Sequence, residues 1–195
     1  TLVTSLGSVM LPRVSNLLSS GNQKAVNKLH EMSFLVYNLV IFPMIAGILI
    51  VNKDFVNFFL GQDFQDAHYA IAIMVFRIFF IGWTNIMGIQ ILIPHNRNRE
   101  FMLSTTIPAV FSVGLNLLLI PPLGYIGASI VSVATEGLVW LIQLYFTRSY
   151  LKEIKILPSM LKIFLAALLM YSALYSVQAF IHFSSVVNVL IYAVL

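Results

Sequence analysis

The chain has 195 residues, of which 59% are hydrophobic and only 9% are charged, and its mean hydropathy is +0.93. A soluble domain carries about 25% charged residues, so this composition excludes a cytosolic enzyme, a disordered tail and, despite a formal net charge of +4, a nucleic-acid-binding module. The lack of cysteine excludes disulfide frameworks, thiolate nucleophiles and cysteine-ligated metal centres.

Apolar segments of membrane-spanning length fill most of the chain. Crossing the hydrocarbon core as a helix takes roughly 20 apolar residues, and five complete spans are predicted, at 33–51, 69–93, 101–120, 124–146 and 160–181. Partial spans at 1–11 and 186–195 make the chain begin and end inside apolar runs, which we expect of a piece of a longer protein. The connections are too short for a soluble domain. The prediction is therefore a single all-α, polytopic transmembrane helical lobe over 1–195.

Cationic residues occur in alternate connections between these spans. The segments 12–32, 95–100 and 147–159, with Lys162 just beyond the last, hold nine lysines and arginines, whereas the other connections hold only Lys53. Cytoplasmic loops are rich in lysine and arginine, so these three segments are predicted to face the cytoplasm. Apolar residues recur among the polar ones of 12–32, which predicts that part of this loop is a helix lying on the membrane surface.

Two ionisable side chains, Arg77 and Glu136, are predicted to lie at membrane depth, away from the ends of their spans. A charge at membrane depth costs several kcal/mol unless something compensates it, so both are candidates for function. At about 100° per residue, Arg77 shares a helix face with Thr84 and Gly88, and Asn85 lies nearby. The face that carries Glu136 also carries Tyr125, Ser129, Ser132, Trp140, Gln143 and Thr147.

The spans 101–120 and 160–181 carry polar faces as well, the first with Ser112 and Asn116. Four polar faces predict either a water-filled cavity or a set of hydrogen bonds between helices, because serine, threonine and small residues also pack membrane helices together. For Arg77 and Glu136 the alternatives are a structural ion pair, a protonated carboxyl that donates to a carbonyl, or a pair that closes in the empty site and opens when a ligand binds.

The sequence shows no catalytic or metal-binding constellation. The four histidines, at positions 30, 68, 95 and 182, are scattered over connections, and none has a second histidine or a carboxylate at metal-ligand spacing. Glycine-rich phosphate loops are absent too. We therefore expect no metal, no cofactor and no enzymatic activity.

Several short motifs follow one another along the chain. They are LPRVS at 11–15, FLGQDF at 59–64, QILIP at 90–94, NLLLIP at 116–121 and GYIGAS at 124–129, followed by Glu136 and Gln143. Together they resemble the C-terminal half of bacterial polysaccharide repeat-unit flippases, in the multidrug, oligosaccharidyl-lipid and polysaccharide exporter superfamily, over nearly the whole chain. Gln62 departs from the pattern, because relatives often carry an acidic residue there.

The resemblance implies two helical lobes around a central cavity, of which this chain is the second. It also implies alternating access that moves an undecaprenyl-pyrophosphate-linked oligosaccharide across a bacterial plasma membrane. In that arrangement Arg77 faces the pyrophosphate or an acidic sugar, and Glu136 couples transport to a proton or a sodium ion. The expected partners are the bilayer, the lipid-linked substrate, the cation and an N-terminal lobe. The expected substrate-binding residues are Arg77, Thr84, Asn85, Asn116 and Gln143.

Two other functions stay open at this point. A multidrug or small-molecule exporter would have the same architecture. A membrane polymerase or glycosyltransferase of polysaccharide assembly is disfavoured, because the connections are too short to carry its catalytic residues.

Overall fold

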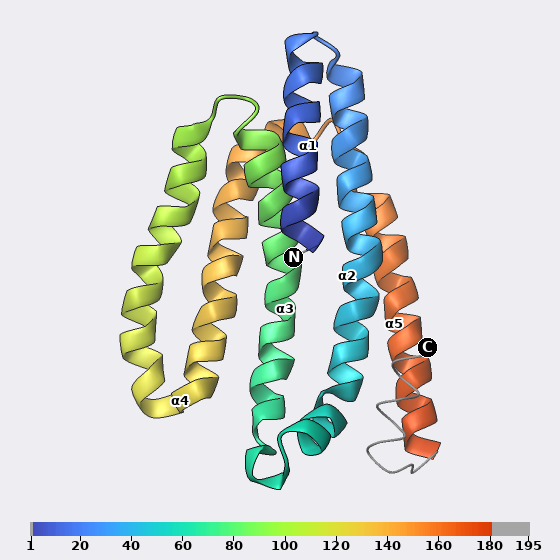
Figure 1. Cartoon of the computed structure of the whole chain (residues 1–195), viewed down its shortest axis with the longest axis vertical. Coiled ribbons are helices and arrows are strands. Elements are labelled where there is room, and N and C mark those ends of the chain that lie inside the picture. The colour runs from blue at the N-terminus through green and yellow to red at the C-terminus, as the bar shows by residue number, and fades with distance from the viewer. Residues whose placement is uncertain (1, 181–195) are drawn as a thin grey trace.

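The computed structural model describes residues 2–180, which form an all-helical bundle (Figure 1). The predicted all-α membrane fold is confirmed: four helical segments are long and apolar enough to cross a bilayer, and one of them doubles back on itself. The elements are α1 (Leu2–Ser19), α2 (Gln23–Phe59), the 3-10 helix η1 (Gln62–Phe64), α3 (Ala67–Asn85), the π-helix η2 (Ile86–Leu92), α4 (Asn98–Leu151) and α5 (Leu157–Phe180). The predicted partial span at 186–195 and the last residue of the span 160–181 lie outside the described residues.

The loop predicted at 12–32 is instead a helical hairpin. Residues 12–19 continue α1, a turn closes at 20–22, and α2 already begins at Gln23. Asn22 caps the new helix, because its side-chain oxygen accepts a hydrogen bond from the backbone N–H of Ala25 at 3.2 Å. The apolar residues that suggested a surface helix pack inside the hairpin, where Val14 and Val26 are fully buried.

The connections lie alternately at two ends of the bundle, as the charge pattern predicts. Figure 1 shows the α1–α2 turn, the η2–α4 turn and the α4–α5 loop at one end, and the η1 region with the bend of α4 at the other. The first three are the cation-bearing connections. The structure thus gathers the cationic connections at one end, and the assignment of that end to the cytoplasm stays a prediction.

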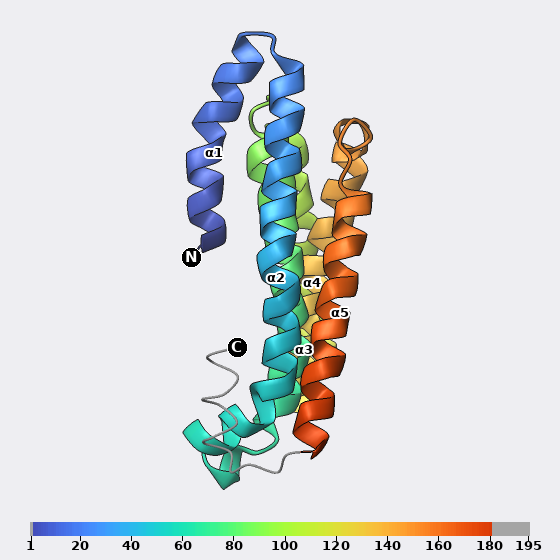
Figure 2. The ribbon, with the colours of Figure 1, turned by 90° about the vertical axis from the view of Figure 1, so that its right-hand side faces the viewer.

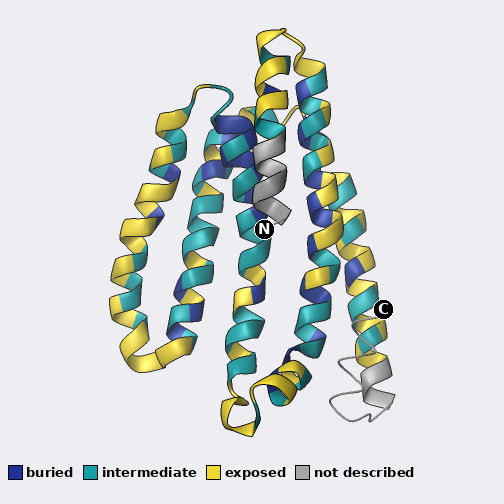
Figure 3. Ribbon diagram, in the orientation of Figure 1, coloured by how far each residue is buried: buried dark blue, intermediate teal, exposed yellow. Residues whose placement is uncertain are grey.

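The buried core lies between α2 and the α3–η2 segment. Phe34 of α2 and Trp83 of α3 have ring centroids 4.7 Å apart, and Met87 and Ile91 of η2 complete the cluster without exposed surface. α1 and α5 lie on opposite sides of α2 (Figure 2). The outward faces are apolar but exposed, most clearly along α4, where Leu117 is 74% exposed (Figure 3). Exposed apolar faces of this extent require lipid or another protein surface.

The predicted span 69–93 is formed by two helix types in series. α3 changes into the π-helix η2, in which residues bond five positions apart: the N–H of Ile93 donates to the carbonyl of Gly88 at 3.1 Å. In an α-helix the carbonyl at position 90 would accept from residue 94, but Pro94 has no N–H. The next N–H along the chain, that of His95, donates to the Ile91 carbonyl instead. His30 of α2 supplies the missing donor, with its Nε2 2.9 Å from the Gln90 carbonyl oxygen. Ser33 donates to the side-chain oxygen of Gln90 at 2.8 Å.

Replacing His30 by leucine is expected to destabilise the fold by about 1–3 kcal/mol, because it leaves the buried Gln90 carbonyl without a partner. Thermal unfolding of the detergent-solubilised full-length protein measures the effect. His68→Leu is the matched control, since the His68 ring hydrogen-bonds only within its own turn. Equal melting temperatures for the two variants would show that the bond between α2 and η2 contributes nothing.

The long helix α4 contains two of the predicted spans. Its backbone leaves the helical region at Gly124, with φ 56° and ψ −132°, a conformation that glycine adopts at low cost. The two arms, 98–123 and 125–151, run antiparallel in Figure 1. They approach closely beside the bend, where a Cβ atom on Gly127 would lie 2.2 Å from the Leu119 carbonyl oxygen. This hairpin holds the polar faces of both arms beside α3.

Candidate functional site

An ion pair joins α3 to the second arm of α4 at the middle of both helices. The Nη2 and Nε atoms of Arg77 donate to Oε1 of Glu136 at 3.0 and 3.3 Å. At 1.5 Å per residue, Arg77 lies roughly 15 Å from the start of α3, and Glu136 roughly 18 Å from the Gly124 bend. Both distances are about half of the 30 Å hydrocarbon thickness, so the pair lies near the middle of the length of two candidate membrane spans.

The pair opens into a polar hollow of about 230 Å³. The side chains of Arg77 and Glu136 are 38% and 21% exposed, so neither is sealed in a dry interface. The hollow carries no other charged side chain, and we call it the Arg77–Glu136 hollow. Its lining comes from α3 and from both arms of α4: Arg77, Ser112, Asn116, Ala128, Val131, Ser132, Thr135 and Glu136.

Helical spacing explains how the sequence builds this hollow. Ser112 and Asn116 are four residues apart on the first arm, as are Ser132 and Glu136 on the second, and residues at this spacing share a helix face. The Gly124 bend turns the arms antiparallel, and the faces of both then meet Arg77 of α3. The ion pair weighed in the sequence is therefore formed in this structure, and it lies in a polar hollow shared by three helical segments.

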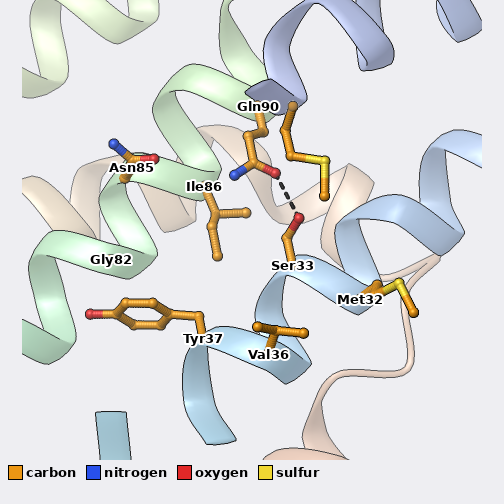
Figure 4. Close-up of a pocket in the computed structure, with 9 residues that line it drawn as sticks. Met32, Ser33, Val36, Tyr37, Gly82, Asn85, Ile86 and Gln90 are labelled. Atoms are coloured by element: carbon orange, nitrogen blue, oxygen red, sulfur yellow. Dashed lines mark hydrogen bonds between the residues drawn. The ribbon is translucent and has the colours of Figure 1, made fainter. Parts of the chain in front are cut away.

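Two of the expected site residues, Thr84 and Asn85, lie elsewhere. Thr84 donates its hydroxyl hydrogen to the Ile81 carbonyl of its own helix at 3.0 Å. Asn85 lines a second pocket of about 130 Å³, between α1, α2 and the α3–η2 junction, together with Ser33 and Gln90 (Figure 4). Its Oδ1 is buried and has no hydrogen-bond partner among the described residues.

Gln143 lies at a third place, between the two arms of α4. It is 1% exposed, and its Nε2 donates to the hydroxyl oxygen of Ser104 at 3.2 Å. Of the expected substrate-binding residues, the structure therefore brings only Arg77 and Asn116 together, beside Glu136. The roles of all these residues stay predictions.

Thr135 is the lining residue that sequence reasoning missed. Its hydroxyl donates to the Val131 carbonyl at 2.7 Å, while its side chain borders the hollow beside Glu136. The signal was present, since Ala128, Ser132 and Thr135 follow one another at spacings of four and three. That row shares Ser132 with the row of Glu136 on the same arm. Within residues 2–180, no group of three histidine, acidic or cysteine side chains is placed to hold a metal ion.

The fold and the hollow define a class of protein: a multi-pass helical membrane protein with a polar hollow that contains an ion pair between two of its spans. Comparison with known sequences gives the family. The sequence profile described as "Lipid II flippase MurJ" matches residues 1–194, and the chain belongs to that family.

The chain is also similar to individual proteins of known sequence or structure. The chain is 29% identical, over 149 residues, to an uncharacterised membrane protein of Methanocaldococcus jannaschii, covering 76% of the chain and 29% of that protein. It is 28% identical, over 158 residues, to a putative O-antigen transporter of Escherichia coli, covering 76% of the chain and 35% of the transporter. It also shares its fold with the inward closed conformation of the lipid II flippase MurJ, at a TM-score of 0.79 and 17% identity, over 98% of the chain and 41% of that structure. The chain thus spans about a third of the length of these curated relatives.

Proposed function

We propose that the chain forms the second lobe of a flippase that moves an undecaprenyl-pyrophosphate-linked oligosaccharide across a bacterial plasma membrane. The lipid-linked unit would pass from the cytoplasmic to the outer leaflet and supply capsule or other surface polysaccharide. Membership of a flippase family and the similarity to a putative O-antigen transporter support this proposal. The much greater length of the relatives supports a further lobe that shares the transport pathway.

The Arg77–Glu136 hollow carries the proposal. A substrate of this class bears a pyrophosphate, and a guanidinium matches phosphate oxygens bidentately through its rigid fork of donors. Among the described residues, Arg77 is the only cationic side chain that lines the hollow, and part of its surface is open. Asn116, on the same hollow, is proposed to add a hydrogen bond to the substrate. No covalent step is proposed, because exposing the hollow alternately to the two sides would be sufficient for transport.

Glu136 is proposed to bind the coupling cation, a proton or a sodium ion. Its carboxylate is the only acidic group lining the hollow, and it is surrounded there by hydroxyl and amide oxygens. Hard oxygen ligands of this kind suit both a proton and a small alkali cation.

The test is to delete the gene for the full-length protein and locate the lipid-linked repeat units. We expect them to accumulate on the inner leaflet, while surface polysaccharide is lost and is restored by the wild-type gene. Single repeat units that still reach the outer surface would instead indicate a polymerase. Unchanged polysaccharide with altered resistance to cationic compounds would indicate a drug exporter. Either result would overturn the proposal.

A further inference from the structure

We propose that Glu136 is an intramolecular competitor that occupies Arg77 in the empty transporter and must release it before an anionic substrate can bind. This inference rests on the proposed function of Arg77 and adds a mechanism for substrate release. It concerns the order of binding events at the site. Removing an ordinary substrate contact weakens substrate binding, whereas removing the charge of Glu136 should strengthen it.

The geometry of the pair is that of an exchangeable contact. Both hydrogen bonds from Arg77 end on the single oxygen Oε1 of Glu136. Among the described residues, neither Oε2 of Glu136 nor Nη1 of Arg77 has a hydrogen-bond partner. A fork–fork arrangement, with two parallel bonds to two oxygens, would be stronger and more specific. Partial exposure weakens the attraction further, because water screens it.

A pyrophosphate can displace such a partner. It offers several oxygens to the two donors that now share Oε1, and it adds more negative charge than one carboxylate. The hollow gives room beside the pair, and the side chains of Asn116 and Ser132 border the same space. Because the Arg77 fork cannot serve Glu136 and a phosphate fully at once, the two anions compete for one cation.

Displacement leaves an uncompensated carboxylate at membrane depth, which is costly. A proton or sodium ion that neutralises Glu136 removes this cost and frees Arg77 at the same time. Cation binding at Glu136 and substrate binding at Arg77 therefore favour each other, and by linkage the effect is reciprocal. When the cation leaves, Glu136 recaptures Arg77 and expels the substrate. A single ion pair then sets the affinity for the substrate low enough for release.

The experiment measures binding of undecaprenyl pyrophosphate to the full-length protein in detergent, together with flipping in reconstituted vesicles. Glu136→Gln keeps the size of the side chain and removes its charge. We expect this variant to bind the probe roughly tenfold more tightly, a typical magnitude for coupled sites, and to flip it more slowly. Glu31→Gln is the matched control: it removes the same charge outside the hollow, so both binding and flipping should remain as in the wild type.

A second variant separates this inference from the proposed function. Arg77→Ala is expected to weaken binding, and Arg77→Ala combined with Glu136→Gln to bind no better than Arg77→Ala alone, since competition requires Arg77. If Glu136→Gln binds equally or more weakly while Arg77→Ala loses affinity, the competitor role is wrong and the role of Arg77 stands. If Arg77→Ala binds like the wild type, the proposed site fails, and the competitor role fails with it.

Discussion

Replacing Arg77 by alanine is expected to reduce flipping of the lipid-linked substrate by about 30-fold or more. Truncating one partner of a buried hydrogen-bonded charge pair costs about 2–5 kcal/mol. The partial exposure of this pair places the expected cost at the lower end of that range, and each 1.4 kcal/mol is a factor of ten. The substrate pyrophosphate would lose its only cationic contact in the hollow. The measurement is the rate at which full-length protein, reconstituted into vesicles, exposes a lipid-linked oligosaccharide on the opposite leaflet.

Loss of the ion pair must be separated from loss of folding. Arg77→Ala also leaves Glu136 unpaired, so the single variant is expected to unfold at a lower temperature. The double variant Arg77→Ala with Glu136→Gln removes both charges and should regain stability without regaining transport. Arg77→Lys keeps the charge without the planar fork and should retain part of the activity. Wild-type flipping by a correctly inserted Arg77→Ala protein would rule out the assignment of this residue.

Replacing Gly127 by valine is expected to prevent the α4 hairpin from closing. A Cβ atom at this position would lie 2.2 Å from the carbonyl oxygen and 2.7 Å from the carbonyl carbon of Leu119. Backbone atoms cannot swing away as a flexible side chain does, so the two arms must separate. We expect a loss of about 3 kcal/mol or more in the free energy of unfolding, at the upper end of overpacking effects, and a loss of transport.

The control for this variant lies on the other arm of the same hairpin. Nothing lies within 4 Å of the Cβ position of Gly114, so Gly114→Ala should be neutral or should stabilise the helix by about 1 kcal/mol. Thermal unfolding in detergent compares the two variants. A normal melting temperature for Gly127→Val would mean that the arms do not approach as closely as the structure shows.

The spans were predictable because each depends on a local property. Hydropathy over roughly 20 residues is sufficient to identify a crossing helix, and the alternating lysines and arginines place the connections at two ends. The hairpin at 12–32 could not be predicted in this way, because apolar and polar residues are mixed along this stretch and no continuous apolar run marks the ends of its helices. Their stability comes from contacts between α1 and α2, such as those that bury Val14 and Val26.

The site was predictable only as far as the helices are regular. Arg77 and Glu136 were identified as candidate site residues because a charge at membrane depth is energetically costly. This criterion does not depend on which helix lies beside them. The helical projection placed Gly88 on the face of Arg77, but η2 bonds five residues apart and is wound differently from the α-helix assumed. Gln143 shares a stripe with Glu136 on one helix, yet Ser104 of the opposite arm engages it. Neither the π-helix nor the pairing of the arms can be read from periodicity.

The bond from His30 to the Gln90 carbonyl restricts how the lobe can deform. Most membrane helices satisfy their own backbone and can slide past one another without exposing a polar group. Here a carbonyl released by Pro94 depends on a neighbouring helix, so any shear between α2 and η2 would leave a buried oxygen without a hydrogen-bond partner. We therefore expect these two segments to move together, so that the rearrangements of the proposed transport cycle would be accommodated at other helix contacts.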